Sequence, residues 1–368
     1  MFQMRRPNNA DVIEAKRCEA SWHGIFPGME PLQPLPIFLT ETTGADGGLI
    51  CGYQVLADGT TRVIAAEAMV EALEQDELVT WLHFNLSDAR ARRWLLDAGL
   101  LPAALREVLH ERDDNRRMEA TDDGVLLVMS DFTFDAEADP SEVGPLWCFV
   151  KRHLLITARM GALRSVDELR LQLRGGNTEA RTGAELLATL LDMRSARLRR
   201  LANGMIDHLD GIEDEILAGD IREQRAQLGR TRRLCARLRR QFVPERADLR
   251  KFLQRPTSAL AEDDRDALQS STEALGFAIE EIAELYERAK LLQEELASRL
   301  AENTGRNLYV LSILTAVLLP MTLVTGIFGM NVADLPGLHS EGMFWRIMLL
   351  IFASGGVTLA ALFWRKLL

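Results

Sequence analysis

The stretch from Leu308 to Asn331, LYVLSILTAVLLPMTLVTGIFGMN, most constrains what this chain can fold into. No charged residue occurs between Arg306 and Asp334. A helix crosses the hydrocarbon core of a bilayer with about 20 consecutive apolar residues. Because backbone amides find no water partners in hydrocarbon, such a segment must be helical. The pattern therefore predicts a membrane helix over residues 307–328.

A second apolar run follows a short connection at residues 329–343. It predicts a second membrane helix over 344–364, followed by a basic tail at 365–368. A buried helical hairpin in a globular core is the alternative explanation. Globular cores seldom contain two runs of this length in tandem, so the membrane interpretation is favoured and the lipid bilayer becomes one partner of the chain.

The hydrophilic part of the chain has two regions, and the first is rich in strand patterns. Short β-branched and aromatic runs alternate with turns and with two helical patterns, which predicts an α+β domain at 46–165, a mixed sheet with flanking helices. Residues 1–45 contain several prolines and little periodicity, and we interpret them as an irregular extension. Strands are expected at 49–56, 61–65, 78–85, 124–134, 146–150 and 153–157, and helices at 88–98 and 102–110.

The second hydrophilic region reads as helix almost throughout. A helical hairpin is predicted at 166–256, with long helices at 185–217 and 221–242. Breaks are expected at Pro244 and Pro256, because proline removes a helical hydrogen bond and clashes with the preceding turn.

The last soluble helix begins after Pro256 and shows no break before the first apolar run. A stalk at 257–306 is therefore predicted to continue directly into the membrane helix. The resulting single helix, Glu262 to Phe328, would be on the order of 100 Å long at 1.5 Å per residue. Pro320 is expected to kink this helix without ending it, because membrane helices tolerate proline.

Composition excludes several classes of function. The net charge of −11 argues against nucleic-acid binding, which needs a basic surface. No phosphate-binding loop of the Walker type occurs, so ATP is not an expected partner, and no catalytic triad pattern points to an enzyme. The four cysteines form no closely spaced pair that would indicate a local zinc knuckle.

The distribution of basic residues predicts orientation. The connection at 329–343 contains no Lys or Arg, although Arg346 lies close to it. By the positive-inside rule, both termini and the soluble part are expected in the cytoplasm, as in a multi-pass protein of a bacterial inner membrane. The basic residues that set this orientation are Arg299, Arg306, Arg365 and Lys366.

The end of the first apolar run bears a short motif. Gly329, Met330 and Asn331 stand between two terminal membrane helices, after a long charged helix and an apolar segment with a Pro-Met-Thr centre. This arrangement resembles the CorA superfamily of divalent-cation transporters, and looks closest to its ZntB-type zinc-transporter branch. The resemblance extends from about Leu49 to the end of the chain. It implies a funnel-shaped homopentamer in which the first span lines an axial pore.

One face of the first span fits a pore lining under this resemblance. It mixes leucines with small and hydroxyl-bearing residues, which suits a narrow conduit with hydrophobic constrictions and weakly polar stations. Plain helix–helix packing is the alternative, because small residues and threonines also gather at such contacts. The face consists of Leu308, Leu311, Thr315, Leu319, Thr322 and Gly326.

The motif and the following loop supply the candidate entrance. A ring of Asn331 amides could hydrogen-bond the water shell of a divalent ion without stripping it, and Gly329 permits an unusual backbone beside it. A simple turn is the other interpretation, because Asn and Gly are common at helix ends. Asp334 and Glu341 would attract cations to the mouth, and His339 is a weaker candidate zinc ligand.

The resemblance implies transport of a divalent cation, with Zn²⁺ preferred, and no permanently bound cofactor. The loop sequence Asp334-Leu335-Pro336-Gly337 is closer to the zinc branch than to the magnesium pattern. Uptake driven by the proton gradient is what that branch implies. The alternatives are a CorA-type magnesium, cobalt or nickel channel, or a membrane-anchored coiled-coil scaffold or sensor that moves no ion.

Overall fold

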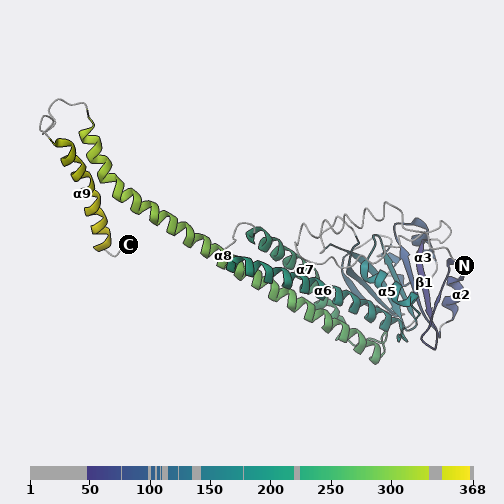
Figure 1. Cartoon of the computed structure of the whole chain (residues 1–368). Helices are drawn as coiled ribbons and strands as arrows, with labels where there is room; N and C mark the ends of the chain where they lie inside the picture. The colour runs from purple at the N-terminus through teal and green to yellow at the C-terminus, as the bar shows by residue number, and fades with distance from the viewer. Residues whose placement is uncertain are drawn as a thin grey trace. The chain divides into compact units, whose positions relative to one another are not determined.

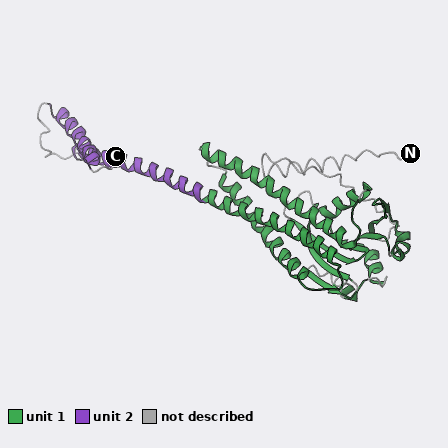
Figure 2. Ribbon diagram, turned by 90° about the horizontal axis from the view of Figure 1, so that it is seen from below, with its two compact units in different colours: residues 1–293 green, residues 294–368 purple. Residues whose placement is uncertain are grey.

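The computed structural model divides the chain into two compact units, residues 1–293 and residues 294–368 (Figure 2). The expected extension at 1–45 lies outside the described residues, as do residues 104, 105, 108 and 110 of the expected helix at 102–110. The structure describes residues 48–75, 77–97, 101–103, 106–107, 109, 115–122, 124–134, 142–176, 178–218, 224–330 and 342–364.

The first unit contains a seven-stranded sheet with the strand order β2-β1-β3-β7-β6-β5-β4. Figure 1 shows this sheet together with the helices of the unit. The β3–β7 pair is parallel and the other neighbouring pairs are antiparallel, so the expectation of a mixed sheet is confirmed. The strands are β1 (Leu49–Val55), β2 (Thr61–Val63), β3 (Val79–Asn85), β4 (Arg117–Thr121), β5 (Gly124–Phe132), β6 (Val143–Lys151) and β7 (Leu154–Arg159).

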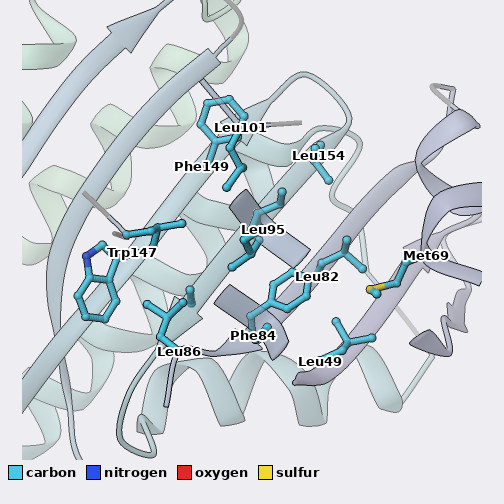
Figure 3. Close-up of a cluster of buried hydrophobic side chains, with 14 of the residues drawn as sticks. Leu49, Met69, Leu82, Phe84, Leu86, Leu95, Leu101, Trp147, Phe149 and Leu154 are labelled. Carbon is cyan, nitrogen blue, oxygen red and sulfur yellow. The ribbon is translucent and has the colours of Figure 1, made fainter. Parts of the chain in front are cut away.

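One face of the sheet forms a hydrophobic core with short helices (Figure 3). Alternate residues of neighbouring strands point to this face, as the two-residue repeat of a strand requires. Phe84 stacks on Trp94 of helix α3 with ring centroids 5.1 Å apart. The helices on this side are a 3₁₀ turn (Ala66–Ala68), α2 (Met69–Glu74) and α3 (Ala89–Asp97).

Two further helices, α5 (Arg164–Arg174) and α6 (Gly183–Ala218), contact the sheet. Helix α6 begins against the turn that joins β6 and β7, where the Gly183 amide donates to the Arg152 carbonyl at 2.7 Å. A Cβ at Gly183 would lie 2.5 Å from the carbonyl oxygens of Lys151 and Leu154, so this approach requires glycine.

Helix α7 (Gln224–Leu253) corrects the expected break at Pro244, which lies inside the helix. The proline removes one backbone hydrogen bond, but buried side chains fix the helix on both sides of it. Phe242 and Leu249 are at most 1% exposed, and Glu245 pairs with Arg194 of α6. The burial of α7 outweighs the lost hydrogen bond, so the helix passes through the proline.

Helix α8 (Glu262–Phe328) runs without interruption from the first unit into the second, over the bounds expected from the sequence. Helix α9 (Met343–Trp364) is the last element among the described residues. Three elements were not expected: strand β4, the 3₁₀ turn at Ala66–Ala68 and helix α2. Strand β4 lies at the edge of the sheet and lacks a clear apolar alternation, and α2 is a helix of 6 residues, too short to show a clear period.

Candidate functional site

The apolar part of α8 has two distinct sides. Its half-buried residues recur every three or four positions, so they share one face of the helix. At one of them, Met321, the side chain reaches Gly355 of α9, which identifies this face as the one that packs on α9. The half-buried positions are Ile313, Ala316, Val317, Pro320, Met321, Val324 and Phe328.

The six residues expected to line a pore lie on the opposite side of α8 and are exposed in the single chain. Leu308, Leu311 and Leu319 leave 59%, 57% and 67% of their surface uncovered. The structure therefore brings Leu308, Leu311, Thr315, Leu319, Thr322 and Gly326 onto one continuous face that α9 leaves open.

The hydroxyl groups on this face are already satisfied as donors. Thr315 Oγ1 donates to the Leu311 carbonyl at 2.8 Å, and Thr322 Oγ1 donates to the Leu318 carbonyl at 2.9 Å. Threonine commonly makes this bond to the preceding helical turn. Each oxygen keeps lone pairs that can accept hydrogen bonds from water. The face can therefore contact a hydrated cation through neutral acceptors.

Close contact between α8 and α9 depends on a glycine that sequence reasoning did not single out. A Cβ at Gly355 would lie 1.9 Å from Met321 Cε, whereas the neighbouring Gly356 has nothing within 4 Å. Only a residue without a side chain lets the methionine lie across α9 at this point. A run of four small residues, Ala353 to Gly356, within an otherwise large apolar segment was the available signal.

The Gly-Met-Asn motif begins where α8 ends. The Gly329 amide donates to the Thr325 carbonyl at 2.8 Å, in the helical pattern, and Met330 is 56% exposed. Asn331, Asp334, His339 and Glu341 lie outside the described residues. The expected roles of this motif and loop therefore stay predictions.

The described residues of the first unit contain one notable pairing of metal-ligand types. Cys51 and His83 lie opposite each other in the β1–β3 register. The His83 ring is already occupied, because Nδ1 bonds Thr157 Oγ1 at 2.8 Å and Nε2 accepts from Arg159 Nε at 3.0 Å. Burial raises the pKa of the Cys51 thiol to about 12. Among the described residues, no group of three His, Cys, Asp or Glu side chains could hold a metal ion.

The sequence analysis also did not predict a buried ion pair. Arg194 of α6 and Glu245 of α7 are both fully buried and pair directly. Arg194 Nη1 donates to the Ser130 carbonyl at 2.8 Å, and the Ser130 amide donates to Glu245 Oε2 at 3.1 Å. The pair therefore joins two helices to strand β5. An arginine in an apolar helical repeat was its signal in the sequence.

The second unit defines the class of protein. By length and composition α8 and α9 could each cross a membrane, with mean hydropathies of 2.2 and 2.1 in windows that are 0% and 6% buried. Apolar helices left this exposed fit a lipid environment, so the fold is that of a membrane protein with a large α+β extramembrane unit. The family model of the CorA-like Mg²⁺ transporter protein matches residues 76–366, and the chain belongs to this family.

Relatives with known names agree with this membership. The chain is 31% identical over 320 residues to the divalent cation transporter CmaX of Pseudomonas aeruginosa, covering 86% of this chain and 94% of that protein. It is 27% identical over 314 residues to the zinc transport protein ZntB of Pectobacterium carotovorum, covering 84% of this chain and 93% of that one.

Solved structures agree on the fold. The structure of full-length CmaX matches with a TM-score of 0.73 at 29% identity, covering 88% of this chain and 99% of that chain. The complete structure of the CorA magnesium transporter from Methanocaldococcus jannaschii matches with a TM-score of 0.70 at 17% identity, covering 84% and 96%. At that identity the second match supports the fold alone.

Proposed function

We propose that this chain transports divalent metal cations across the bacterial inner membrane, with zinc preferred, through the axial pore of a homopentamer. The observation that supports this most directly is the exposed face of α8 from Leu308 to Gly326, which has no charged side chain and lies opposite α9. Family membership supplies the class of cargo. The named relatives are transporters and not enzymes, in keeping with an ion-conducting role.

An oligomer follows from the geometry of the two spans. Two helices packed against each other enclose no aqueous path, so a pore requires several copies around one axis. The open face of α8 would then line that axis, with leucines as constrictions and Thr315 and Thr322 as acceptors for the water shell of the ion. Helix α9, on the other side of α8, would face lipid.

The motif and loop would form the entrance. We propose that Asn331 amides bind the hydrated ion, with Gly329 and Met330 ending the pore helix beside them. Asp334 and Glu341 would raise the local cation concentration without holding the ion, and His339 is the one histidine of the loop, with an imidazole of the kind that ligates zinc.

The choice of zinc rests on the loop sequence and on the ZntB relatives, whose names state zinc. CmaX is named for divalent cations in general and the matching family model for Mg²⁺, so a magnesium, cobalt or nickel channel is the second candidate. We further propose uptake driven by the proton gradient, with both termini cytoplasmic. No carboxylate lies between Arg306 and Asp334 to relay a proton, so any coupling would involve groups outside that segment.

Flux into proteoliposomes tests this proposal. Purified full-length chain would be reconstituted and offered Zn²⁺, Mg²⁺ or Ni²⁺, with and without an imposed proton gradient. We expect zinc flux to exceed that of the other two ions and to rise when the gradient is imposed. Faster magnesium flux would favour the second candidate, and a mass-verified oligomer without any flux would favour a scaffold or sensor.

A further inference from the structure

The soluble part of α8 has a stripe of residues that are exposed in the single chain. Its members recur at alternating steps of four and three residues, the spacing of a coiled-coil seam. Two large apolar side chains are 63% and 62% exposed there, Phe277 and Leu291. We call the whole set of exposed residues the acidic stripe. It consists of Glu273, Phe277, Glu280, Glu284, Glu287 and Leu291.

Helix α7 has an exposed stripe of the opposite charge. Four arginines recur at steps of three, four and three residues, so they also share one helix face. We call them the basic stripe: Arg230, Arg233, Arg237 and Arg240. Both stripes belong to the first compact unit.

The two stripes lie on different sides of the α7–α8 pair. The contact between these helices includes the Arg239 guanidinium over the Tyr286 ring at 5.5 Å. Phe277 lies nine positions before Tyr286, and Arg230 lies nine positions before Arg239. Nine residues are two and a half helical turns, so Phe277 and Arg230 point away from this contact, whereas Glu280, at the edge of the acidic stripe, reaches Arg246 of α7.

The stripes also lie at the same height along the helices. Besides the Arg239–Tyr286 contact, Arg246 Nη1 lies 3.4 Å from Glu280 Oε1. These two contacts show that α7 and α8 are antiparallel and fix their register. Arg240 is accordingly level with Glu284, and Arg237 is level with Glu287.

We infer that the acidic stripe of one subunit packs against the basic stripe of a neighbouring copy of this chain. The inference rests on the homo-oligomer of the proposed function and adds which surfaces meet in it. A ring is closed by heterologous contacts, which need two different and complementary patches on different sides of each subunit. If the axis of the ring runs along α8, rotation about it preserves height, and residues of equal height would meet.

Charge and apolar surface both favour this partner. A two-fold interface would place each stripe against its own copy, and glutamates would then face glutamates. Glu280 and Glu287 make long ion pairs within their own chain, 3.4 Å to Arg246 and 3.8 Å to Lys290. An arginine guanidinium of the neighbouring copy could approach each carboxylate more closely than these partners do. Phe277 and Leu291 would be buried at the same interface. This would account for the two large apolar side chains that are exposed on an otherwise charged stripe.

Disulfide cross-linking of the full chain in detergent tests this inference. In a background without Cys18, Cys51, Cys148 and Cys235, the variant combining Arg240→Cys with Glu284→Cys would be oxidised and separated under denaturing conditions. We expect a ladder of covalent oligomers up to the native mass, because each subunit links to the next. The matched control combines Arg240→Cys with Glu273→Cys, which lies on the same stripe but about 16 Å away along the helix, and should give several-fold less product.

The outcomes separate this inference from the proposed function. Cross-linking by Glu284→Cys alone would mean that the acidic stripes converge on the axis, and would overturn the inference. A native-mass oligomer with wild-type metal flux but no ladder from the pair would overturn it as well, and would leave the transport proposal standing. A monomeric wild type would overturn both the inference and the homopentamer.

Discussion

At the scale of single residues, the pair Arg194–Glu245 is distinctive among the described residues because both of its side chains are fully buried. Removing one partner of such a pair leaves an uncompensated charge away from water. We expect Glu245→Ala to destabilise the first unit by about 3–5 kcal/mol. The matched control is Glu119→Ala at the exposed pair with Arg117, which should cost about 0–1 kcal/mol. Denaturant unfolding of the two variants measures the difference, and equal effects would contradict the argument.

Buried His83 gives the first unit a pH dependence. Burial, with Arg159 and Arg170 nearby, holds the pKa of His83 well below its usual value, so the folded state keeps the ring neutral. In the unfolded chain the pKa returns to about 6.5. The stabilising effect is therefore present above pH 6.5 and is lost as the pH falls below it, by up to about 1.4 kcal/mol per pH unit.

His83→Gln tests this dependence, because glutamine keeps hydrogen-bonding capacity without a titrating ring. The stability difference between wild type and variant should be constant above pH 7 and should change in favour of the variant between pH 6.5 and 5. Unfolding midpoints of both proteins across this range measure it. Since His208 is common to both, its own lowered pKa cancels. A difference independent of pH would show that His83 titrates normally.

Asn331 is the residue on which the entrance proposal depends. If its amide binds the hydrated ion, Asn331→Ala should abolish metal flux or reduce it by at least about tenfold, which corresponds to 1.4 kcal/mol. Assembly should be unchanged, because the substitution removes one small polar side chain. Proteoliposome flux with native mass as a control provides the measurement. Wild-type flux through a correctly assembled variant would exclude the role.

At the scale of elements, the contact between α8 and α9 can be tested by substituting the two neighbouring glycines Gly355 and Gly356 of α9 in turn. Gly355→Leu should push α9 away from Met321 and cost about 1–3 kcal/mol through overpacking. Gly356→Leu, one position later and without a neighbour within 4 Å, should be tolerated in the single chain. Thermal stability of the two variants in detergent compares them. Met321→Ala should partly rescue Gly355→Leu, and failure of that rescue would argue against the contact.

Helix α8 also shows how far local sequence determines an element. Its bounds follow from acidic residues at Glu262, Asp263 and Asp264, an unbroken apolar repeat, and a glycine after Phe328. Pro244 in α7 shows the opposite case. A local rule predicts a break there, and burial against α6 and the sheet overrides it.

At the scale of the whole molecule, orientation across the membrane is open to direct measurement. In a cysteine-free background, Ser340→Cys should react with a membrane-impermeant thiol reagent applied to intact cells. Gln269→Cys, on the soluble part of α8, should react only after the cells are permeabilised. The expectation follows from the absence of Lys and Arg between residues 329 and 343. The reverse pattern would place the soluble unit outside.

The sequence by itself determined the two apolar helices, the continuous helix from Glu262 to Phe328 and most strands of a mixed sheet. These features depend on charge-free runs and on periods of 3.6 or 2, which are readable within one segment. Only the tertiary structure decided the parallel β3–β7 pairing, the passage of α7 through Pro244, and the contacts of Arg194 with Glu245 and of Met321 with Gly355. Each of these depends on which residues from distant segments become neighbours. The free energy that selects them comes from burial and packing between elements, and no single segment contains that information.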